Sequence, residues 1–255
     1  MDQKEVEQYL IDFEKKEIPT MIKRDLSIGK TNKIKSIIGP RRSGKTTFLY
    51  QKMREMRNEK KNILFLNFEN TKLSGATYKE IIKIIELHKR LFLSNTDEKP
   101  TLFLDEPQNV DLWEKSVREL FDEGYEIYIS GSNSKLLSKE ISTSLRGRSL
   151  SFLMLPFSFK EFLGIKGFVY NPLLSTEEKI KLLGYLDEYM DFGSFPEIIL
   201  DSNNDNKIKN LESYFDLTIY KDIMERHKIK DSVLLKWFLK ILFTSYSKEF
   251  SINKI

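Results

Sequence analysis

Short apolar runs alternate with amphipathic stretches through residues 1–155 of the chain. The runs are almost continuously apolar, and the stretches between them repeat their apolar residues with the period of an α-helix. Such alternation predicts a parallel β-sheet with helices on both of its faces. The expected strands are residues 35–38, 62–68, 101–104, 125–130 and 151–155, and the expected helices are residues 2–17, 45–58, 78–93 and 112–122.

After Pro156 the strand pattern ends and only helical periodicity remains. The polar segment 201–206 is expected to be a connector between two of these helices. The fold class is therefore expected to be α/β, with a core over residues 1–155 followed by a small helical lid over residues 156–244. The helices expected in the lid are residues 157–165, 177–190, 207–226 and 233–244.

A glycine-rich segment joins the first expected strand to the helix that follows it. It fits the pattern G-x-x-x-x-G-K-[ST], whose glycines let backbone N–H groups turn toward phosphates while the helix N-terminus adds partial positive charge. Lys45 is expected to reach the β- and γ-phosphates of ATP, Thr46 to bind Mg²⁺ through its hydroxyl, and Thr47 to contact the α-phosphate more weakly. The segment consists of Gly39, Pro40, Arg41, Arg42, Ser43, Gly44, Lys45 and Thr46.

Two acids, Asp105 and Glu106, follow the apolar strand expected over residues 101–104. Ligands of open α/β sheets bind at the carboxyl ends of the strands, so both acids are expected beside the phosphates. Asp105 is the candidate Mg²⁺ carboxylate, and Glu106 is the candidate general base that orients and deprotonates the attacking water. A second acid directly after the first favours hydrolysis over phosphoryl transfer to a small molecule.

Polar positions at two other strand ends are candidates for supporting roles, and each has a structural alternative. Asn133, or Ser132 beside it, is a candidate for holding the attacking water against the γ-phosphate, the alternative being a polar turn that caps the next helix. Asn67 is a candidate for a hydrogen bond to Glu106, the alternative being an ordinary residue at the start of a loop.

Two arginines precede the last expected strand, in the segment Leu145-Arg146-Gly147-Arg148. An arginine fork stays charged and binds phosphate bidentately. Arg148, with Arg146 as second choice, is therefore a candidate for reaching the nucleotide of a neighbouring subunit, which implies a homo-oligomer. The alternative is a surface arginine paired with an acid.

The composition narrows the class of protein. Lys and Arg total 42 against 38 Asp and Glu, and a net charge of +4 is too small to indicate nucleic-acid binding by itself. Cysteine is absent, which excludes disulfides and thiolate metal sites and fits a cytoplasmic location. Neither a signal segment nor a membrane span is recognisable. His88 and His227 stand in charged surroundings and are interpreted as surface residues.

Taken together, the motifs resemble those of the prokaryotic, notably archaeal, AAA-type P-loop ATPases of the AAA+/STAND kind. The resemblance covers nearly the whole chain and implies an AAA+-like core of about five parallel strands, followed by a helical lid. The segments that carry it are GPRRSGKTT, LDEPQNVDLWE, ISGSNSKLL, LRGR, LPFSFKEF, GSFPEIIL and YFDLTIYKDIMERHKI.

The resemblance also assigns roles to the end of the chain. In STAND proteins a Gly-x-Pro turn of the lid touches the nucleotide, and here Pro196 stands at that turn, with Ser194 in place of the expected glycine. The alternative is a plain turn between two helices. The family further implies a winged-helix module after the lid. Residues 245–255 resemble the start of this module, which implies a truncated chain and a DNA or protein partner bound through the absent part.

The helix expected over residues 233–244 is apolar on most of its faces. Helices of that kind normally lie inside a core. We therefore expect Trp237, Phe238 and Phe243 to contribute to apolar surface that the chain alone leaves uncovered.

The motifs predict Mg²⁺-dependent ATP binding and hydrolysis, coupled to conformational change. The alternative is a slow nucleotide-operated switch or DNA-associated regulator, in which ATP binding rather than turnover is the function. The Asp105-Glu106 pair disfavours a kinase for small molecules. A GTPase is disfavoured because no Asn-Lys-x-Asp segment follows the glycine-rich loop.

Overall fold

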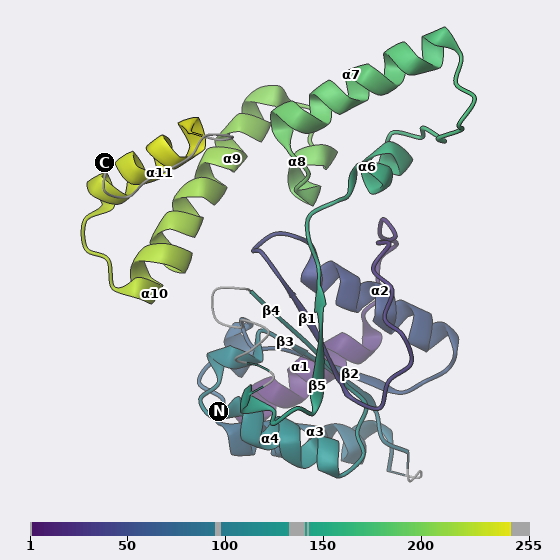
Figure 1. The fold of residues 1–255 in the computed structure, drawn as a ribbon. Coiled ribbons are helices and arrows are strands. Elements are labelled where there is room, and N and C mark those ends of the chain that lie inside the picture. The colour runs from purple at the N-terminus through teal and green to yellow at the C-terminus, as the bar shows by residue number, and fades with distance from the viewer. Residues whose placement is uncertain (1, 95–97, 133–140, 142, 246–255) are drawn as a thin grey trace. The chain divides into compact units, whose positions relative to one another are not determined.

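The computed structural model describes residues 2–94, 98–132, 141 and 143–245, apart from the side chains of Ser132 and Arg226. Five strands form one sheet in the order β2-β3-β4-β1-β5, and every neighbouring pair is parallel (Figure 1). The expected α/β fold with a parallel sheet is therefore confirmed. The strands are β1 (Ile34–Gly39), β2 (Ile63–Asn67), β3 (Thr101–Asp105), β4 (Ile127–Ser132) and β5 (Ser149–Leu153).

Residues Met1–Leu200 form one compact unit and residues Asp201–Ile255 a second. The first unit contains the sheet and all the helices that cover it. Its helices are α1 (Gln3–Lys15), α2 (Lys45–Asn58), α3 (Tyr78–Phe92), α4 (Trp113–Asp122), α6 (Phe159–Ile165), α7 (Thr176–Phe192) and α8 (Pro196–Leu200).

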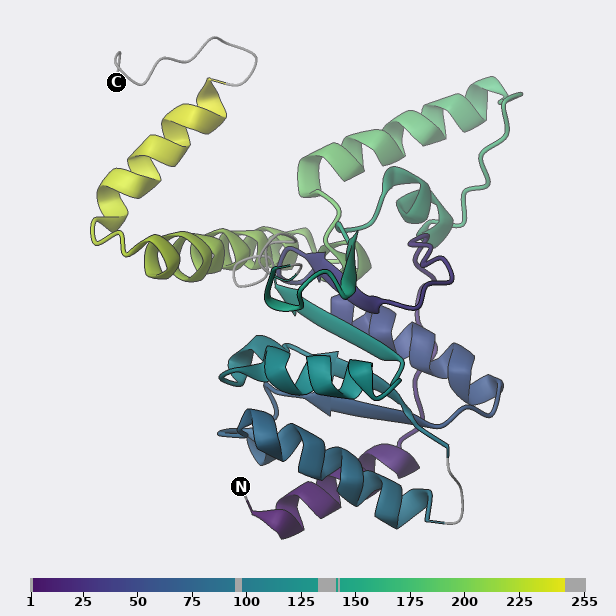
Figure 2. The ribbon, with the colours of Figure 1, turned by 60° about the horizontal axis from the view of Figure 1, so that its bottom comes forward.

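Helices cover both faces of the sheet (Figure 2). Because side chains alternate along a strand, β2 sends Phe65 to one face and Leu64 to the other. Phe65 joins Phe48 of α2 in one core cluster. Leu64 joins Ile81 of α3 and Val117 of α4 in the other. The apolar runs of β2 and β3 are therefore strands buried on both sides, as is usual in a parallel sheet covered by helices.

Helix α1 lies along the outer strand β2. The Tyr9 hydroxyl donates a hydrogen bond to the Phe65 carbonyl at 3.2 Å and accepts one from the Asn67 N–H at 3.1 Å. Both backbone groups belong to β2, the strand at one end of the sheet order. Burial raises the pKa of Tyr9 well above its ordinary value, so this hydroxyl keeps its proton at any physiological pH.

A third cluster forms where the chain leaves the sheet. Phe157, Phe162 and Ile199 are buried there, and Tyr185 and Tyr189 of α7 pack against them. The Tyr189 hydroxyl donates to the Phe157 carbonyl at 2.8 Å. Helix α8 was not expected, since the sequence around Pro196 predicts only a turn. A proline is favoured in the first turn of a helix, which allows α8 to begin at that residue.

The second unit consists of helical segments. The helix expected over residues 207–226 is found, but its middle is π-helical rather than α-helical. Helix α11 carries the exposed apolar side chains expected of it: Trp237 is 47% exposed and Phe243 is 64% exposed, while Phe238 is half-buried. The segments are α9 (Asn204–Leu217), the π-helix Thr218–Met224, α10 (Glu225–His227) and α11 (Ser232–Thr244). Across the described helices of both units, none has the length and apolar character needed to cross a membrane.

The surface interpretation of His88 is wrong, whereas that of His227 is confirmed. His88 is 3% exposed because it continues the buried face of α3, four residues after Ile84. Its charged neighbours Lys89 and Arg90 lie toward solvent, and they made the whole segment look exposed in the sequence. Neither ring nitrogen of His88 has a hydrogen-bond partner within the described parts of the chain. Burial lowers the pKa of His88 from 6.5 to about 4.

We expect His88 to make the protein less stable in mild acid. Between pH 6.5 and about 4 the unfolded chain binds a proton at this position and the folded chain does not, so the free energy of unfolding falls as the pH falls. Between pH 7 and pH 5 the wild-type chain should lose about 2 kcal/mol more than His88→Leu in urea unfolding. His227→Leu, at an exposed site, should behave as wild type. Equal losses in wild type and His88→Leu would contradict the assignment.

Candidate functional site

The glycine-rich loop joins the carboxyl end of β1 to the start of α2, and both of its glycines are required by its geometry. A Cβ on Gly39 would lie 2.0 Å from the Met154 carbonyl oxygen, because the backbone after β5 passes directly against the loop. Gly44 has a φ of 93°, in the left-handed region that favours glycine. The sequence thus folds into a tight turn whose last residue caps α2.

Lys45 and Thr46 open helix α2 and point to different partners. Lys45 is 6% exposed, and its Nζ donates to the carbonyls of Gly39 at 3.1 Å and Pro40 at 2.9 Å, so the ammonium lies inside the loop. The Thr46 hydroxyl donates to Asp105 Oδ2 at 2.9 Å. The glycine-rich loop and the first acid, which are 59 residues apart, are therefore in direct contact.

Asp105 ends β3 with its side chain 2% exposed. Its other oxygen, Oδ1, accepts a hydrogen bond from the Ser130 hydroxyl of β4. Burial raises the pKa of Asp105 above its ordinary value, although the bonds from Ser130 and Thr46 oppose that shift. Ser130 was not singled out from the sequence. The only available signal was its place two residues before Ser132, on the same face of a strand.

Glu106 follows with an unusual backbone conformation, at a φ of 52° and a ψ of 45°. A left-handed conformation is costly for a residue other than glycine and is often found at functional sites. The Glu106 N–H donates to the Ser130 carbonyl at 2.9 Å. The half-buried Glu106 side chain accepts a hydrogen bond from the Gln108 amide. Gln108 therefore holds the candidate base, a contact that sequence reasoning did not assign.

These groups fit a magnesium ion bound together with a nucleotide. The described residues hold no cluster of three His, Cys, Asp or Glu side chains that would bind a metal by itself. Mg²⁺ is usually bound through one or two carboxylates together with phosphate oxygens and water. The Thr46 hydroxyl and the Asp105 carboxylate, already in contact, are the donor types that such an ion takes from the protein.

The other loop residues lie around this centre. Ser43 is fully buried, and Thr47 is exposed on the first turn of α2. The Arg42 guanidinium pairs with the Glu197 carboxylate of α8 at 2.6 Å. Arg41 is half-buried in the loop.

Pro196 approaches the same loop from α8. A Cβ placed on Gly44 would lie 3.7 Å from Pro196 Cγ. The structure therefore brings Pro196 to the glycine-rich loop, although the two positions are far apart in the sequence. The preceding turn is tied down by a hydrogen bond from the Phe157 N–H to the Ser194 carbonyl at 2.9 Å.

Arg148 does not reach this site within its own chain. It precedes β5 at the strand's amino end, where Ser149 pairs with Ile34, so it lies at the opposite edge of the sheet from Gly39, about 17 Å away by the rise of a strand. Its guanidinium makes two hydrogen bonds to Asp122 of α4, at 2.9 and 3.0 Å.

The remaining candidates have other surroundings. The side-chain oxygen of Asn67 accepts the Glu69 N–H at 2.8 Å, a local turn contact of the kind the alternative reading describes. Asn133 lies outside the described residues. The strand before it, β4, lies beside β1, with Ser132 opposite Gly39.

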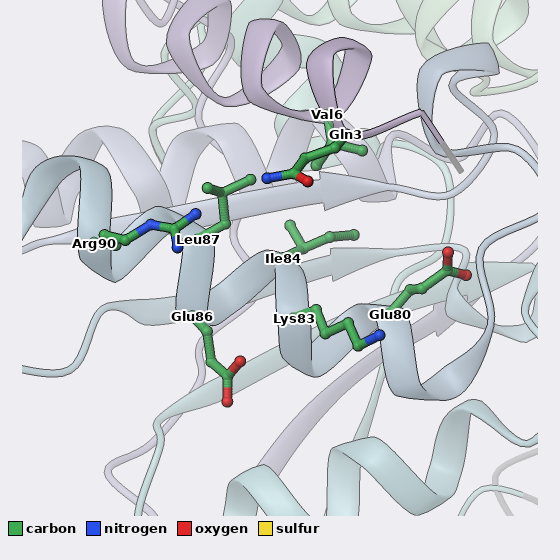
Figure 3. A pocket seen from close by; sticks show the side chains of 8 residues that line it. All are labelled: Gln3, Val6, Glu80, Lys83, Ile84, Glu86, Leu87 and Arg90. Carbon is green, nitrogen blue, oxygen red and sulfur yellow. The ribbon is translucent and has the colours of Figure 1, made fainter.

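A separate hollow of about 510 Å³ lies between α1 and α3 (Figure 3). Ile84 and Leu87 line it on α3 and Val6 on α1, and charged side chains of both signs surround them. No residue of the glycine-rich loop contributes to it. Its mixed charges identify no particular ligand.

Residues 31–163 match a family described as an AAA domain, and residues 183–255 match a domain of unknown function, DUF8612. An uncharacterized protein of Methanocaldococcus jannaschii is 44% identical over 92% of this chain and 52% of its own length. One of Haemophilus influenzae is 31% identical over 88% of this chain and 54% of its own length. The chain thus spans about half the length of these curated relatives.

Among solved structures, AMPPCP-bound DnaA from Aquifex aeolicus is similar with a TM-score of 0.37 and 14% identity. The match covers 96% of this chain and 69% of that chain.

We expect the buried carboxylate of Asp105 to cost folding stability. Because its pKa is raised in the folded chain, wild type loses stability as the pH rises through the carboxyl range. Asp105→Asn removes the buried charge and keeps one acceptor oxygen, while its NH2 group can donate to the other hydroxyl, so its unfolding midpoint at pH 7 should rise, by on the order of 1 kcal/mol or roughly 2–4 °C.

The control is Asp122→Asn, since Asp122 is a surface carboxyl whose pKa the Arg148 pair lowers. This variant should gain no stability. A midpoint of Asp105→Asn clearly below that of wild type would show that the charge stabilises the fold.

Proposed function

The chain belongs to the AAA domain family, and from that premise we propose that it binds ATP with Mg²⁺ and hydrolyses it, coupling both to conformational change. One observation carries the proposal. Thr46 of the phosphate loop and Asp105 of β3 are already hydrogen-bonded, and Glu106 follows directly. The side chains that an ATP hydrolase needs for metal, phosphate and water thus lie at one edge of the sheet.

Each group then has a role set by its chemistry. Lys45 exchanges its carbonyl partners for the β- and γ-phosphate oxygens, and the loop N–H groups bind the same phosphates. Thr46 and Asp105 hold Mg²⁺, which neutralises charge on the phosphate oxygens when it is bound. Glu106 accepts the proton of the attacking water. Pro196, beside Gly44, contacts the nucleotide from α8.

A slow nucleotide-operated switch is the second candidate, and one contact favours it. The Glu106 carboxylate accepts a hydrogen bond from the Gln108 amide, so the oxygen that would take the proton of the attacking water is already occupied. Hydrolysis by such a site is slow until a protein or DNA partner releases Glu106. Gln108→Ala separates the two functions: a large gain in kcat supports the switch, and unchanged or lower kcat supports steady turnover.

Lys45→Ala should weaken Mg²⁺-dependent ATP binding by about 10- to 100-fold, since it removes a charged donor to two phosphates. Glu106→Gln should bind ATP as wild type and lose about 10²–10⁴-fold in kcat, because an amide accepts no proton. Calorimetry and phosphate release measure the two effects. Lys52→Ala, on the same helix and paired with Glu55, is the control and should change neither. Wild-type affinity in Lys45→Ala would refute the phosphate site.

Arg148 is proposed to act on the nucleotide of a neighbouring subunit, leaving Asp122 when the homo-oligomer forms. Arg148→Ala should then reduce kcat by about 10³-fold or more. Asp122→Asn, which frees Arg148 without removing it, should not reduce kcat. Mixing inactive Arg148→Ala with inactive Glu106→Gln should restore some activity. No rescue on mixing, together with a turnover number independent of protein concentration, would leave Arg148 as a surface ion pair.

A further inference from the structure

Arg24 lies in the irregular segment between α1 and β1, where no sequence motif marks it. It is nevertheless 7% exposed. Burying a guanidinium is unfavourable unless its N–H groups find partners. The partners of Arg24 therefore indicate what this side chain holds in place.

Its guanidinium joins three segments that are distant in the sequence. Nη1 donates to the Ser43 carbonyl of the phosphate loop at 2.8 Å. Nη2 donates to the carbonyls of Leu155 at 2.7 Å and Pro156 at 3.3 Å, directly after β5. Nε donates to Glu161 Oε1 of α6 at 2.8 Å. Each nitrogen of the fork is thus bonded.

Glu161 fixes the orientation of this fork. Its Oε1 also accepts the Asp25 N–H at 2.9 Å, and its Oε2 accepts the Ser158 N–H at 2.8 Å in the capping box of α6. Burial raises the pKa of Glu161, but these hydrogen bonds outweigh it and hold that pKa below its ordinary value. The carboxylate therefore stays charged opposite Arg24.

The contact to Ser43 determines which way one peptide of the loop faces. In a trans peptide the C=O and the following N–H point in opposite directions, and the described chain contains no cis peptide. With the Ser43 oxygen bonded to Arg24, the Gly44 N–H is directed away from Arg24. Gly44 allows either orientation at little steric cost, so an external contact has to select one.

We propose that Arg24 is a positioning residue for nucleotide binding. It holds the Ser43 carbonyl away from the phosphate cradle, the space that the N–H groups of the glycine-rich loop enclose, and keeps the Gly44 N–H turned into that space. The inference rests on the proposed function, because a cradle of N–H groups matters only if phosphates bind there. Arg24 itself touches no phosphate. It also links the loop to α6 through Glu161.

Arg57 provides a matched control. Its Nη1 and Nη2 donate to the carbonyls of Lys16 at 2.7 Å and Phe13 at 3.2 Å, and its guanidinium lies 5.1 Å from the Phe13 ring. The Arg24 guanidinium likewise lies 4.6 Å from the Phe157 ring. Arg57 is at the far end of α2 from the loop and is half-buried, so it shares the carbonyl and ring contacts of Arg24 but neither its location nor its ion pair with Glu161.

The experiment compares Arg24→Lys with Arg57→Lys. Lysine keeps the charge opposite Glu161, which protects folding, but it lacks the fork that reaches Ser43, Leu155 and Glu161 together. We expect the dissociation constant for fluorescently labelled ADP with Mg²⁺ to rise about tenfold in Arg24→Lys and less than twofold in Arg57→Lys. Arg24→Lys should lose more in unfolding midpoint than Arg57→Lys, because Arg24 is the more buried, so affinities are compared at a temperature at which both variants are folded. Lys52→Ala, at a residue outside the site, should bind as wild type in the same assay.

Hydrogen exchange of residues 39–47 without nucleotide supplies a second readout. Exchange should be faster in Arg24→Lys than in Arg57→Lys or wild type, because the loop peptide is no longer held. Unchanged affinity in Arg24→Lys, or an equal loss in both arginine variants, would overturn the proposal. If wild type binds no nucleotide, the proposed function fails. Loop exchange then decides whether Arg24 holds the Ser43 peptide, and unchanged exchange refutes that as well.

Discussion

The carboxylate of Asp105 joins the separate elements of the site by hydrogen bonds. It accepts hydrogen bonds from Thr46 on α2 and Ser130 on β4, and it stands at the end of β3. This meeting depends on the parallel sheet, because only parallel strands bring their carboxyl ends to one edge. It also depends on β4 lying between β3 and β1, which places Ser130 beside Asp105. The buried charge at the centre is unfavourable in isolation and is tolerated because two hydroxyls hold it.

The sheet and most helices were predictable because their signals are local. A strand buried on both faces must be almost continuously apolar, and β2 and β3 obey that rule. Strand β5 is less apolar because it is the outer strand at the other end of the sheet and is partly exposed. The errors arise where tertiary packing decides. His88 has charged neighbours in the sequence, but the helical period of α3 places its side chain on the buried face. The π-helical segment Thr218–Met224 leaves no mark on the apolar periodicity of the sequence. Helix α8 has only five residues, too few to show a helical period.

The residues of the site likewise divide into those that the sequence predicts and those that it does not. Lys45, Thr46, Asp105 and Glu106 were predicted because a phosphate loop and an acid pair are contiguous patterns with a mechanism. Ser130 and Arg24 were not, because what they do is defined by a partner elsewhere in the chain. Gln108 was not, because its contact with Glu106 depends on the left-handed backbone at Glu106, which the sequence does not signal. Arg24 meets Ser43 and Glu161 across 19 and 137 residues, and no local pattern encodes such contacts. The motif thus identifies the groups of the proposed nucleotide site, while the groups that orient them emerge only from the fold.

The hydroxyl of Tyr9 has a consequence for solubility. An outer strand presents unpaired N–H and C=O groups, and these are a template onto which a strand of another molecule can add. On β2 the Phe65 carbonyl and the Asn67 N–H are both occupied by Tyr9, and α1 brings the rest of its apolar face to the same core. The strand itself, ILFLN, is apolar and rich in β-forming residues, the composition that promotes intermolecular cross-β pairing. Proteolytic loss of α1 would therefore convert the protected edge of the sheet into a nucleus for aggregation.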